Sequence, residues 1–412
     1  MDERSQHTQE MVNFTSDRFC EATTDNKSLY GGISMVNWFG DISQLGGIGS
    51  KDLPQNPGSY GSSIAQKGYS IYRSLENVLV LEQSMRQKED QVKLKERLDR
   101  MRLGFLTDSD WTDINNRYEK SLSHAEQNNF NHFKTLTVVE TWREADIENR
   151  HRLAQLGVPI ARVLSQGRGR HHKGNLKQMG QIPHECLIAN NSAVILSKNQ
   201  NSLTTYGLNN GSPGIVKAIL YRENEAPPSF PMVVIVDFDN YTGPPWLQSY
   251  PTWVPIVPVE TRCDSECCTR IGLPLLTSYA LPIAKVQGRT IGDGQSATHL
   301  RVKLQSDTKM EQLSLGLAYT AFSRCQRDTD WCLVDLLPRD RLTYINKHPL
   351  MKTRQGELAR LQALSTKTVA KFDMTESKFM YLLRQIDTYA NDGINDAICL
   401  KQKPCNCVAC RN

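Results

Sequence analysis

Two segments of this chain carry residues suited to binding phosphate groups. Residues 277–290 read TSYALPIAKVQGRT and residues 316–324 read GLAYTAFSR, so a polar loop with a glycine precedes a segment ending in Ser-Arg. Glycine lets a backbone approach a phosphate closely, and hydroxyls and a lysine bind its oxygens. A planar, permanently charged guanidinium binds phosphate oxygens bidentately. These residue types therefore suit contacts with phosphate groups, from the loop as well as from Arg324.

Further polar residues follow two predicted strands. Residues 33–39 (ISMVNWF) and 78–81 (VLVL) have the β-branched and aromatic content of buried strands. The first runs into Asp41 and Gln44, which would then lie at the carboxyl edge of a sheet, where α/β folds bind ligands. The second leads to Arg86. Taken singly, a strand-end turn and a solvated surface arginine also explain these residues.

Length and composition narrow the class of protein without identifying it. A chain of 412 residues is long enough for two domains and a small third. Lys and Arg outnumber Asp and Glu by 49 to 44, a net charge of +5 that permits nucleic-acid binding without arguing for it. No apolar run approaches the ~20 residues that span a bilayer, and the chain starts with polar and acidic residues, so neither a secreted nor a membrane protein is expected. The 11 cysteines are then expected to be reduced thiols of an intracellular protein.

Periodicity and turn residues predict the coarse organisation. Helices are expected over 92–103 with Gly104 as terminator, from 108, over 144–157, through parts of 277–324 and beyond 346. Short β segments are expected at 193–196, 215–220 and 232–237, and a buried strand at 331–337. Residues 46–68 and the basic stretch 164–181 are predicted surface loops.

Seven motifs, taken in order, resemble those of the petite-integration-frequency (PIF) type of superfamily-1 DNA helicase, a RecD-like family. They are residues 2–5 (DERS), 31–32 (GG), 39–45 (FGDISQL), 85–87 (MRQ), 207–214 (GLNNGSPG), 277–290 and 316–324. The match runs from the first residue to about Asn346. It implies an α/β, RecA-like P-loop NTPase helicase fold. The implied parts are the C-terminal portion of a first RecA-like domain (1–81), a second RecA-like domain (82–346), a small SH3-like, barrel-like β insertion within it (203–260) and a helical, cysteine-ending tail (347–412).

The resemblance also assigns roles at an ATP site. It implies that Asp2 holds Mg²⁺ and that Glu3 positions the attacking water, although an acidic, disordered terminus would also explain this pair. It implies that Gln44 senses the γ-phosphate. The nucleotide-binding residues that it implies are Asp41, Gln44, Arg86, Gly288 and Arg324, with both arginines reaching the γ-phosphate.

A second set of residues is implied to contact DNA. Thr277, Lys285, Gln287 and Thr290 match the motif that touches the single strand and relays the nucleotide state. Asn210 lies in the turn of the β insertion that helps to grip the strand, and that turn is otherwise an ordinary hairpin turn.

The chain departs from the family pattern at several places. No Gly-x-x-x-x-Gly-Lys-Ser/Thr phosphate loop occurs in it, so we expect a first domain truncated before the Asp-Glu pair and poor or no ATP hydrolysis by this polypeptide. Gly46 and Gly47 replace two prolines. Ala284 and Val286 replace polar residues and are expected to weaken DNA contact, while Pro282 would disturb a helix.

Some residues keep two interpretations. Tyr241, Trp246 and Trp253 suit base stacking, or packing within the protein. Cys399, Cys405, Cys407 and Cys410 could form a weak zinc site or remain free thiols. Cys263, Cys267 and Cys268 are a weaker candidate for metal binding than those four.

The resemblance implies an ATP-dependent DNA helicase that moves 5′ to 3′ on single-stranded DNA. The expected processes are DNA repair, recombination, telomere maintenance or mobile-element replication. Its expected partner is single-stranded DNA or a DNA fork, with no membrane, and the chain is expected to be a monomer. By analogy it would work in the nucleus or the mitochondrion. The alternative is an inactive, helicase-derived DNA-binding or interaction protein, or a gene fragment that lacks the phosphate loop.

Overall fold

The structure, a computed structural model, describes residues 3–372 except 48–51, 59–60, 132–133, 170–172, 175, 228, 264 and 305–314. Contacts divide the chain into two units. The larger unit comprises Met1–Thr8, Ile33–Leu53 and Ser84–Arg354, and the smaller comprises Gln9–Gly32, Pro54–Gln83 and Gln355–Asn412. Residues 1–81, expected to belong to one domain, are therefore shared between the two units. The expected domains, with their boundary at residue 82, stay a prediction.

The larger unit contains a parallel four-stranded sheet of the kind found in α/β proteins. Its strands follow the spatial order β12-β1-β13-β14, and all neighbouring pairs are parallel. The strands are β1 (Thr135–Val139), β12 (Ala280–Pro282), β13 (His299–Val302) and β14 (Trp331–Leu333). The expectation of an α/β fold with a parallel sheet is confirmed.

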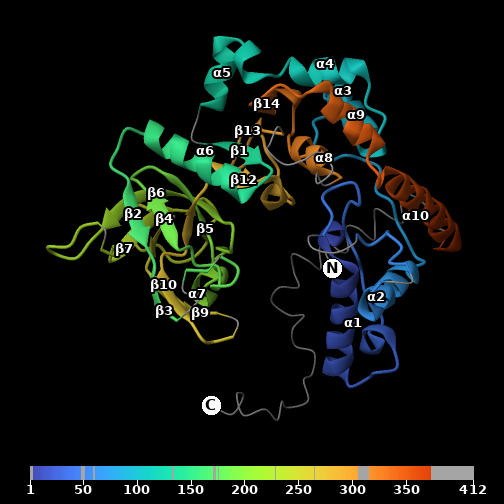
Figure 1. The fold of residues 1–412 in the computed structure, drawn as a ribbon, viewed down its shortest axis with the longest axis horizontal. Coiled ribbons are helices and arrows are strands. Elements are labelled where there is room, and N and C mark those ends of the chain that lie inside the picture. The colour runs from blue at the N-terminus through green and yellow to red at the C-terminus, as the bar shows by residue number, and fades with distance from the viewer. Residues whose placement is uncertain are drawn as a thin grey trace. The chain divides into compact units, whose positions relative to one another are not determined.

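Helices pack on both faces of this sheet (Figure 1). Successive strand residues point to opposite faces, so Leu136 and Val138 join the main hydrophobic cluster, whereas Val139 packs with Ala145 of α6 and with Ala280. The main cluster takes side chains from α3, α4, α8 and α9. The helices of this unit are α3 (Val92–Leu103), α4 (Asp108–Asn115), α5 (His124–Phe130), α6 (Trp142–Gln155), α7 (Asn201–Thr204), α8 (Leu317–Phe322) and α9 (Arg339–Lys347).

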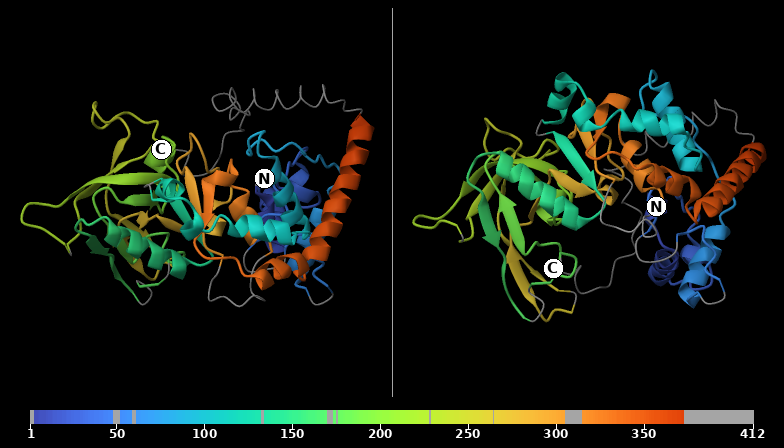
Figure 2. Two further views of the ribbon diagram at one scale, coloured as in Figure 1. Left: turned by 90° about the horizontal axis from the view of Figure 1, so that it is seen from above. Right: turned by 45° about the horizontal axis from the view of Figure 1, so that its top comes forward.

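Antiparallel strands form a second region of the larger unit. In both views of Figure 2 these strands, coloured green to yellow, gather to one side of the parallel sheet. Their order is β11-β5-β6-β7-β8 in one sheet, β3-β10-β9 in another and β2-β4 in a third. The strands are β2 (Ala161–Leu164), β3 (Gln166–Arg168), β4 (Glu185–Ile188), β5 (Ala193–Leu196), β6 (Pro213–Leu220), β7 (Val233–Asp237), β8 (Trp253–Ile256), β9 (Val259–Arg262), β10 (Thr269–Gly272) and β11 (Leu275–Thr277). Antiparallel pairing thus extends beyond 203–260 at both ends, and the SH3-like character of the insertion stays a prediction.

Several elements expected from sequence patterns are present. The helix over 92–103 is α3, which ends against Gly104, and the helix from 108 is α4. The predicted strand 193–196 is β5, and the other β segments correspond to β6 and β7. The strand predicted over 331–337 ends at Leu333.

Five expectations are wrong in whole or in part. The predicted loops 46–68 and 164–181 contain, respectively, the start of a helix at Ser63 and strand β3. Residues 33–39 form no strand, and Met35 and Phe39 are 72% and 54% exposed. A strand needs a neighbouring strand to satisfy its backbone and cover its apolar face, and among the described residues this segment joins no sheet, although the Arg4 amide donates to the Phe39 carbonyl at 2.8 Å. Residues 78–81 also form no strand. Residues 277–290 are not helical but comprise β11, β12 and the 3₁₀ turn η4 (Ile283–Val286), so Pro282 ends a strand and interrupts no helix.

The smaller unit is helical. It contains α1 (Gln9–Thr23), which no sequence pattern had suggested, η2 (Leu29–Gly32), α2 (Ser63–Arg73) and most of α10 (Met351–Phe372). The backbone amides of Val78 and Val80 donate to the hydroxyls of Thr368 and Ser365 on α10, at 3.0 and 3.1 Å. These hydroxyls take the place of a partner strand, which explains why 78–81 is extended without belonging to a sheet. Among the described residues, no helix is long and apolar enough to cross a membrane.

Candidate functional site

Two arginines from distant segments, the buried Arg324 and the half-buried Arg86, meet at one serine. Arg324 follows α8 and is only 1% exposed. Its Nε donates to the Thr320 carbonyl at 3.1 Å, and its Nη2 donates to the Ser323 hydroxyl at 3.0 Å. Arg86 Nη1 donates to the Ser323 carbonyl at 3.0 Å. The fold therefore brings together the two arginines that the sequence singled out.

The electrostatics of this pair suit an anion with several oxygens. Burial, and then the neighbouring Arg86, lower the pKa of Arg324 to about 10, so the guanidinium stays charged at neutral pH. Burial likewise lowers the pKa of Arg86, although Tyr319, Glu3 and Asp41 oppose the shift. Both side chains donate to hydroxyl and carbonyl oxygens, not to carboxylates. Two largely desolvated cations with no bonded carboxylate among the described residues favour a polyanionic ligand such as a polyphosphate.

Asp41 organises the loop that carries Gln44. Its Oδ1 accepts from the Ser43 amide at 2.8 Å, and its Oδ2 accepts from the Tyr319 hydroxyl at 2.9 Å and from Gln44 Nε2 at 3.5 Å. Gln44 Oε1 is buried and has no hydrogen-bond partner among the described residues. A buried, unpaired amide oxygen costs free energy unless a ligand or water meets it, so this atom marks a place for a polar group.

Gly316 lets α8 approach this loop. Its φ is +95°, and a Cβ at this position would lie 2.6 Å from the Gln44 carbonyl oxygen. A larger residue would push α8 away from Gln44. The Thr320 hydroxyl, one turn further along α8, accepts from the Leu45 amide at 2.9 Å and fixes the same contact.

Glu3 lies close to Gln287, a predicted DNA-contacting residue. The Gln287 amide donates to Glu3 Oε2 and to the Ser5 hydroxyl, both at 2.9 Å. Gln287 Oε1 is buried without a hydrogen-bond partner in the part of the chain that the structure describes. Asp2, the predicted Mg²⁺ ligand, lies outside the described residues. Of the predicted acidic pair, only Glu3 is described. Its carboxylate oxygens are of the kind that Mg²⁺ binds.

A cavity of about 580 Å³ opens beside these residues. Lys285, Gln287, Gly288, Thr290 and Asn210 line it, and all five were predicted ligand contacts. The loop at 207–213 supplies the facing wall, where Arg289 Nη2 donates to the Gly211 carbonyl at 2.7 Å. Amides, a hydroxyl and an exposed lysine on a concave surface suit a phosphodiester backbone.

Three residues of the predicted DNA motif take other positions. Thr277 does not line the cavity, and its hydroxyl donates to the Leu187 carbonyl at 2.5 Å. Val286 is fully buried in the main hydrophobic cluster, so its apolar side chain contributes to the core. Ala284 is exposed. The change to valine at 286 therefore does not remove a contact from the cavity wall.

Two hydrogen bonds connect the arginine site with the cavity. Arg86 Nε donates to the Thr290 hydroxyl at 3.2 Å, and Thr290 lines the cavity. Gln287 also lines the cavity and bonds to Glu3. A ligand bound to the arginines and a ligand bound in the cavity would therefore be separated by only one or two protein side chains.

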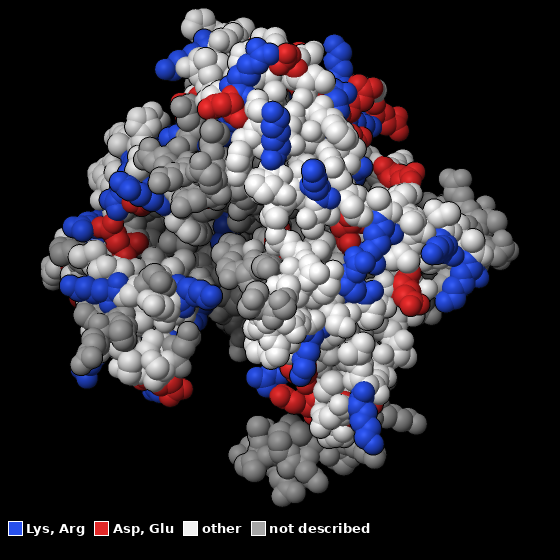
Figure 3. Space-filling model, turned by 45° about the vertical axis from the view of Figure 1, so that its right-hand side comes forward, with Lys and Arg blue, Asp and Glu red and all other residues white. Residues whose placement is uncertain are grey.

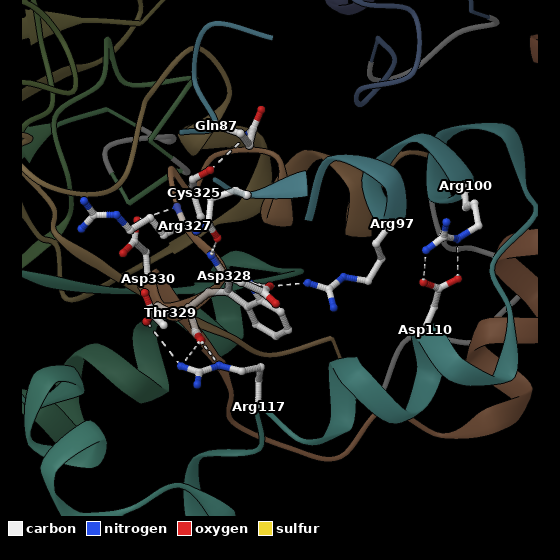
Figure 4. A network of polar contacts seen from close by, with 12 residues as sticks. Gln87, Arg97, Arg100, Asp110, Arg117, Cys325, Arg327, Asp328, Thr329 and Asp330 are labelled. Carbon is white, nitrogen blue, oxygen red and sulfur yellow. Dashed lines mark hydrogen bonds and ion pairs between the residues drawn. The ribbon is translucent and has the colours of Figure 1, made fainter. Parts of the chain in front are cut away.

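The segment that follows Arg324 is anchored by side chains on or beside two helices, α3 and α4 (Figure 4). Gln87 Nε2, just before α3, donates to the Cys325 carbonyl at 3.0 Å. Arg97 of α3 forms an ion pair with Asp328, and Arg117, after α4, donates to the Trp331 carbonyl at 3.2 and 3.1 Å. These bonds fix the chain between Cys325 and Trp331, where β14 begins, and so restrict where Arg324 can lie.

Comparison with known proteins identifies the fold. No family model and no curated protein matches the sequence. A Pif1 helicase from Candida albicans aligns at 19% identity with a TM-score of 0.64, over 87% of this chain and 75% of that one. A Bacteroides Pif1 helicase in complex with ADP-AlF₃ and single-stranded DNA aligns at 15% identity with a TM-score of 0.62, over 87% and 74% of the two chains. A structure of two coordinating Pif1 helicases at forked double-stranded DNA aligns at 15% identity with a TM-score of 0.59, over 82% and 70%.

The chain has the fold of a Pif1 helicase. This agrees with the expected α/β, RecA-like helicase fold, because the likeness covers 87% of the chain in two of these comparisons. In this Pif1-like fold the predicted residues Glu3, Asp41, Gln44, Arg86 and Arg324 gather around α8, although they are scattered along the sequence.

Sequence reasoning missed several residues that shape this Pif1-like site. Tyr319, Thr320 and Ser323 bond to Asp41, Leu45 and both arginines, and Gln87 bonds to the Ser323 and Cys325 carbonyls. Three of them belong to the 316–324 motif, and Gln87 belongs to the 85–87 motif. Membership of these motifs could therefore have drawn attention to the four residues. Their hydrogen-bond partners could not be predicted, because these depend on the fold.

The three aromatic candidates, Tyr241, Trp246 and Trp253, do not line the cavity. Trp246 is 69% exposed, and Tyr250 stacks on Trp253 with ring centroids 4.0 Å apart. Tyr241 donates to the Pro244 carbonyl at 3.0 Å. The four cysteines from Cys399 to Cys410 lie outside the described residues. On the face shown in Figure 3, Lys and Arg side chains are dispersed among uncharged ones, so this face shows no single basic patch.

Proposed function

We propose that this chain acts as an ATP-dependent DNA helicase that moves 5′ to 3′ along single-stranded DNA. The resemblance in sequence motifs and the Pif1-like fold support the proposal, since Pif1 structures have been solved with ADP-AlF₃ and with single-stranded DNA. We further propose Mg²⁺ as cofactor, a monomer as the working form, and a DNA fork as a substrate. DNA repair, recombination, telomere maintenance or mobile-element replication, in the nucleus or the mitochondrion, would be its setting.

One observation carries the proposal. Side chains suited to binding a triphosphate form hydrogen bonds with side chains suited to binding single-stranded DNA. Arg86 and Thr290 bond directly, as do Glu3 and Gln287. A motor must change its grip on DNA when the γ-phosphate appears or leaves. If the Arg86 guanidinium moves to bind the γ-phosphate, its hydrogen bond to Thr290 changes. Because Thr290 lines the cavity, the cavity wall would then change position as well.

The residues divide the work as follows. Arg86 and Arg324 stabilise negative charge on the γ-phosphate as its bond breaks, because a guanidinium in a site with little water interacts strongly with phosphate oxygens. Gln44 Oε1 orients a water molecule or detects the phosphate, and Glu3 accepts a proton or positions the nucleophile. Bound Mg²⁺ would supply further neutralisation of phosphate charge.

Hydrolysis is tested with the full chain. If it is a helicase motor, single-stranded DNA stimulates ATP turnover and Arg324→Ala lowers turnover by about 10³-fold or more. Arg18→Ala is the matched control, because Arg18 is an 81% exposed arginine on α1 whose ion pair with Glu21 is a surface pair. Turnover that Arg324→Ala leaves intact contradicts the assignment of Arg324.

A second candidate function is DNA binding without hydrolysis. It is favoured by the absence of a Gly-x-x-x-x-Gly-Lys-Ser/Thr motif from the 412 residues, since that loop supplies the amides and the lysine that hold phosphates. In that case the chain binds single-stranded DNA with the usual dependence on salt, but nucleotide changes neither the affinity nor its salt dependence. Turnover sensitive to Arg324→Ala excludes this alternative.

A further inference from the structure

Three cysteine thiols meet at the tip of the β9–β10 hairpin. Cys263, Cys267 and Cys268 each direct a sulfur to the same place, and the three sulfurs lie within 4.8 Å of one another. The Cys263 and Cys267 sulfurs are 3.6 Å apart, and those of Cys267 and Cys268 are 3.2 Å apart. The cluster belongs to neither the arginine site nor the cavity, so it is independent of the proposed function.

The backbone holds the three thiols together. The Cys263 amide donates to the Cys268 carbonyl at 3.0 Å, closing the hairpin beyond the Arg262–Thr269 pair, and the Glu266 amide donates to the Cys263 carbonyl at 2.9 Å. Because these bonds fix both ends of the turn, the sulfurs converge without any ligand. A site whose donors are already positioned loses little conformational entropy when it binds.

The third strand of this sheet leaves room for sulfur. Gly169, just after β3, has a φ of +95°, and a Cβ there would lie 2.7 Å from Cys268 Sγ and 2.6 Å from the Cys267 carbonyl oxygen. Any side chain at this position would therefore strike the cluster. On the other side, Met179 packs with Cys263 and Cys268 and closes the apolar wall. Cys267 is exposed, which provides an entry path.

The cluster is more accessible than the other buried cysteines. The Ser265 hydroxyl lies 3.5 Å from Cys263 Sγ and 3.4 Å from Cys267 Sγ, and Cys267 is exposed. Cys186 and Cys332 are buried, and burial raises the pKa of each thiol to about 12. Metals bind thiolates, so the accessible cluster offers sulfur ligands that these two buried thiols do not.

We propose that Cys263, Cys267 and Cys268 bind one Zn²⁺ through three thiolates, with a water molecule as the fourth ligand. Zinc accepts thiolates at about 2.3 Å in tetrahedral geometry, which places the sulfurs about 3.8 Å apart, close to their present spacing. Three S–Zn bonds form, the thiols still protonated release their protons to solvent, and no oxidant is consumed. The ion cross-links the hairpin tip of the β3-β10-β9 sheet.

The test uses the full chain with Cys399, Cys405, Cys407 and Cys410 changed to Ser, so that these residues cannot supply the metal. After reduction, Co²⁺ is titrated as a spectroscopic substitute, and bound Zn²⁺ is measured after dialysis. We expect one equivalent of metal, near-ultraviolet absorption from thiolate-to-Co²⁺ charge transfer, and a higher melting temperature with Zn²⁺. Adding C263S, C267S and C268S should abolish all three results, whereas adding Cys20→Ser, a cysteine on α1, should abolish none.

Two outcomes overturn the proposal. One is the absence of a thiolate absorption band in the parent variant, or equal metal binding after the three hairpin cysteines are replaced. The other is mass spectrometry showing that the reduced cluster closes to a disulfide in preference to binding Zn²⁺. Because Cys267 is exposed, the single variant Cys267→Ser is expected to fold, and its circular dichroism and loss of the band separate metal loss from misfolding.

Discussion

The guanidinium of Arg324 is buried next to that of Arg86, and neither bonds to a carboxylate in the part of the chain that the structure describes. A shift of its pKa from 12.5 to about 10 corresponds to a penalty on the order of 3 kcal/mol. The charged form is the disfavoured one, so the penalty is present in full below about pH 10 and is relieved only as the group deprotonates above it. Residues that bind a ligand commonly reduce stability in this way.

Replacing Arg324 by an uncharged side chain of similar length should therefore separate stability from function. Arg324→Met loses hydrogen bonds to Thr320 and Ser323 but also removes the buried charge, so we expect the free energy of unfolding at pH 7 to rise by about 1 kcal/mol. Urea unfolding of Arg324→Met and of the exposed control Arg18→Met measures this difference. A fall of several kcal/mol would show that Arg324 is a structural residue and not one reserved for an anion.

Elements with a strong local pattern were predicted well. The helix α3 followed from Leu94, Leu98 and Met101, which recur at helical spacing and are all buried. Residues 78–81 carry strand-forming residues equally clearly, yet they belong to no sheet, because their amides bond to Thr368 and Ser365 far along the chain. A local pattern reports propensity, whereas the choice of partner depends on tertiary structure. For the same reason, the motifs predicted that Arg86 and Arg324 are site residues. They could not predict that both side chains form hydrogen bonds with Ser323.

The hydroxyls of α10 should therefore stabilise the extended segment of the smaller unit. Thr368→Val keeps the shape of the side chain but leaves the Val78 amide without its acceptor, so we expect a loss of about 1 kcal/mol in the free energy of unfolding. Thr366→Val is the matched control, because Thr366 is exposed on the same helix and its hydroxyl bonds only within the helix, to the Gln362 carbonyl. Equal losses in the two variants would indicate a change in helix propensity instead.

The whole molecule brings to one region residues from nearly the full length of the described chain. Glu3, Asp41 and Gln44 come from its beginning, Arg86 precedes the parallel sheet, and Gln287 and Arg324 follow the antiparallel strands. No local pattern could give their distances, because these depend on how the sheets and α8 pack. The order of the motifs along the sequence matches that of a helicase family. This match was enough to predict a role for each of these residues.

Coupling between the two parts of the site is the property that depends on the larger unit as a whole. Thr290→Val keeps the shape of the cavity wall but removes the acceptor of Arg86 Nε. We expect the affinity for single-stranded DNA without nucleotide to stay within about threefold, and the change in affinity caused by a non-hydrolysable ATP analogue to shrink by about tenfold, or ~1.4 kcal/mol. Fluorescence anisotropy of labelled DNA measures both, with Thr343→Val, an exposed threonine on α9, as control. If Thr290→Val keeps full coupling, the signal must pass through Gln287 and Glu3, and Gln287→Glu, which opposes two carboxylates, should then abolish it.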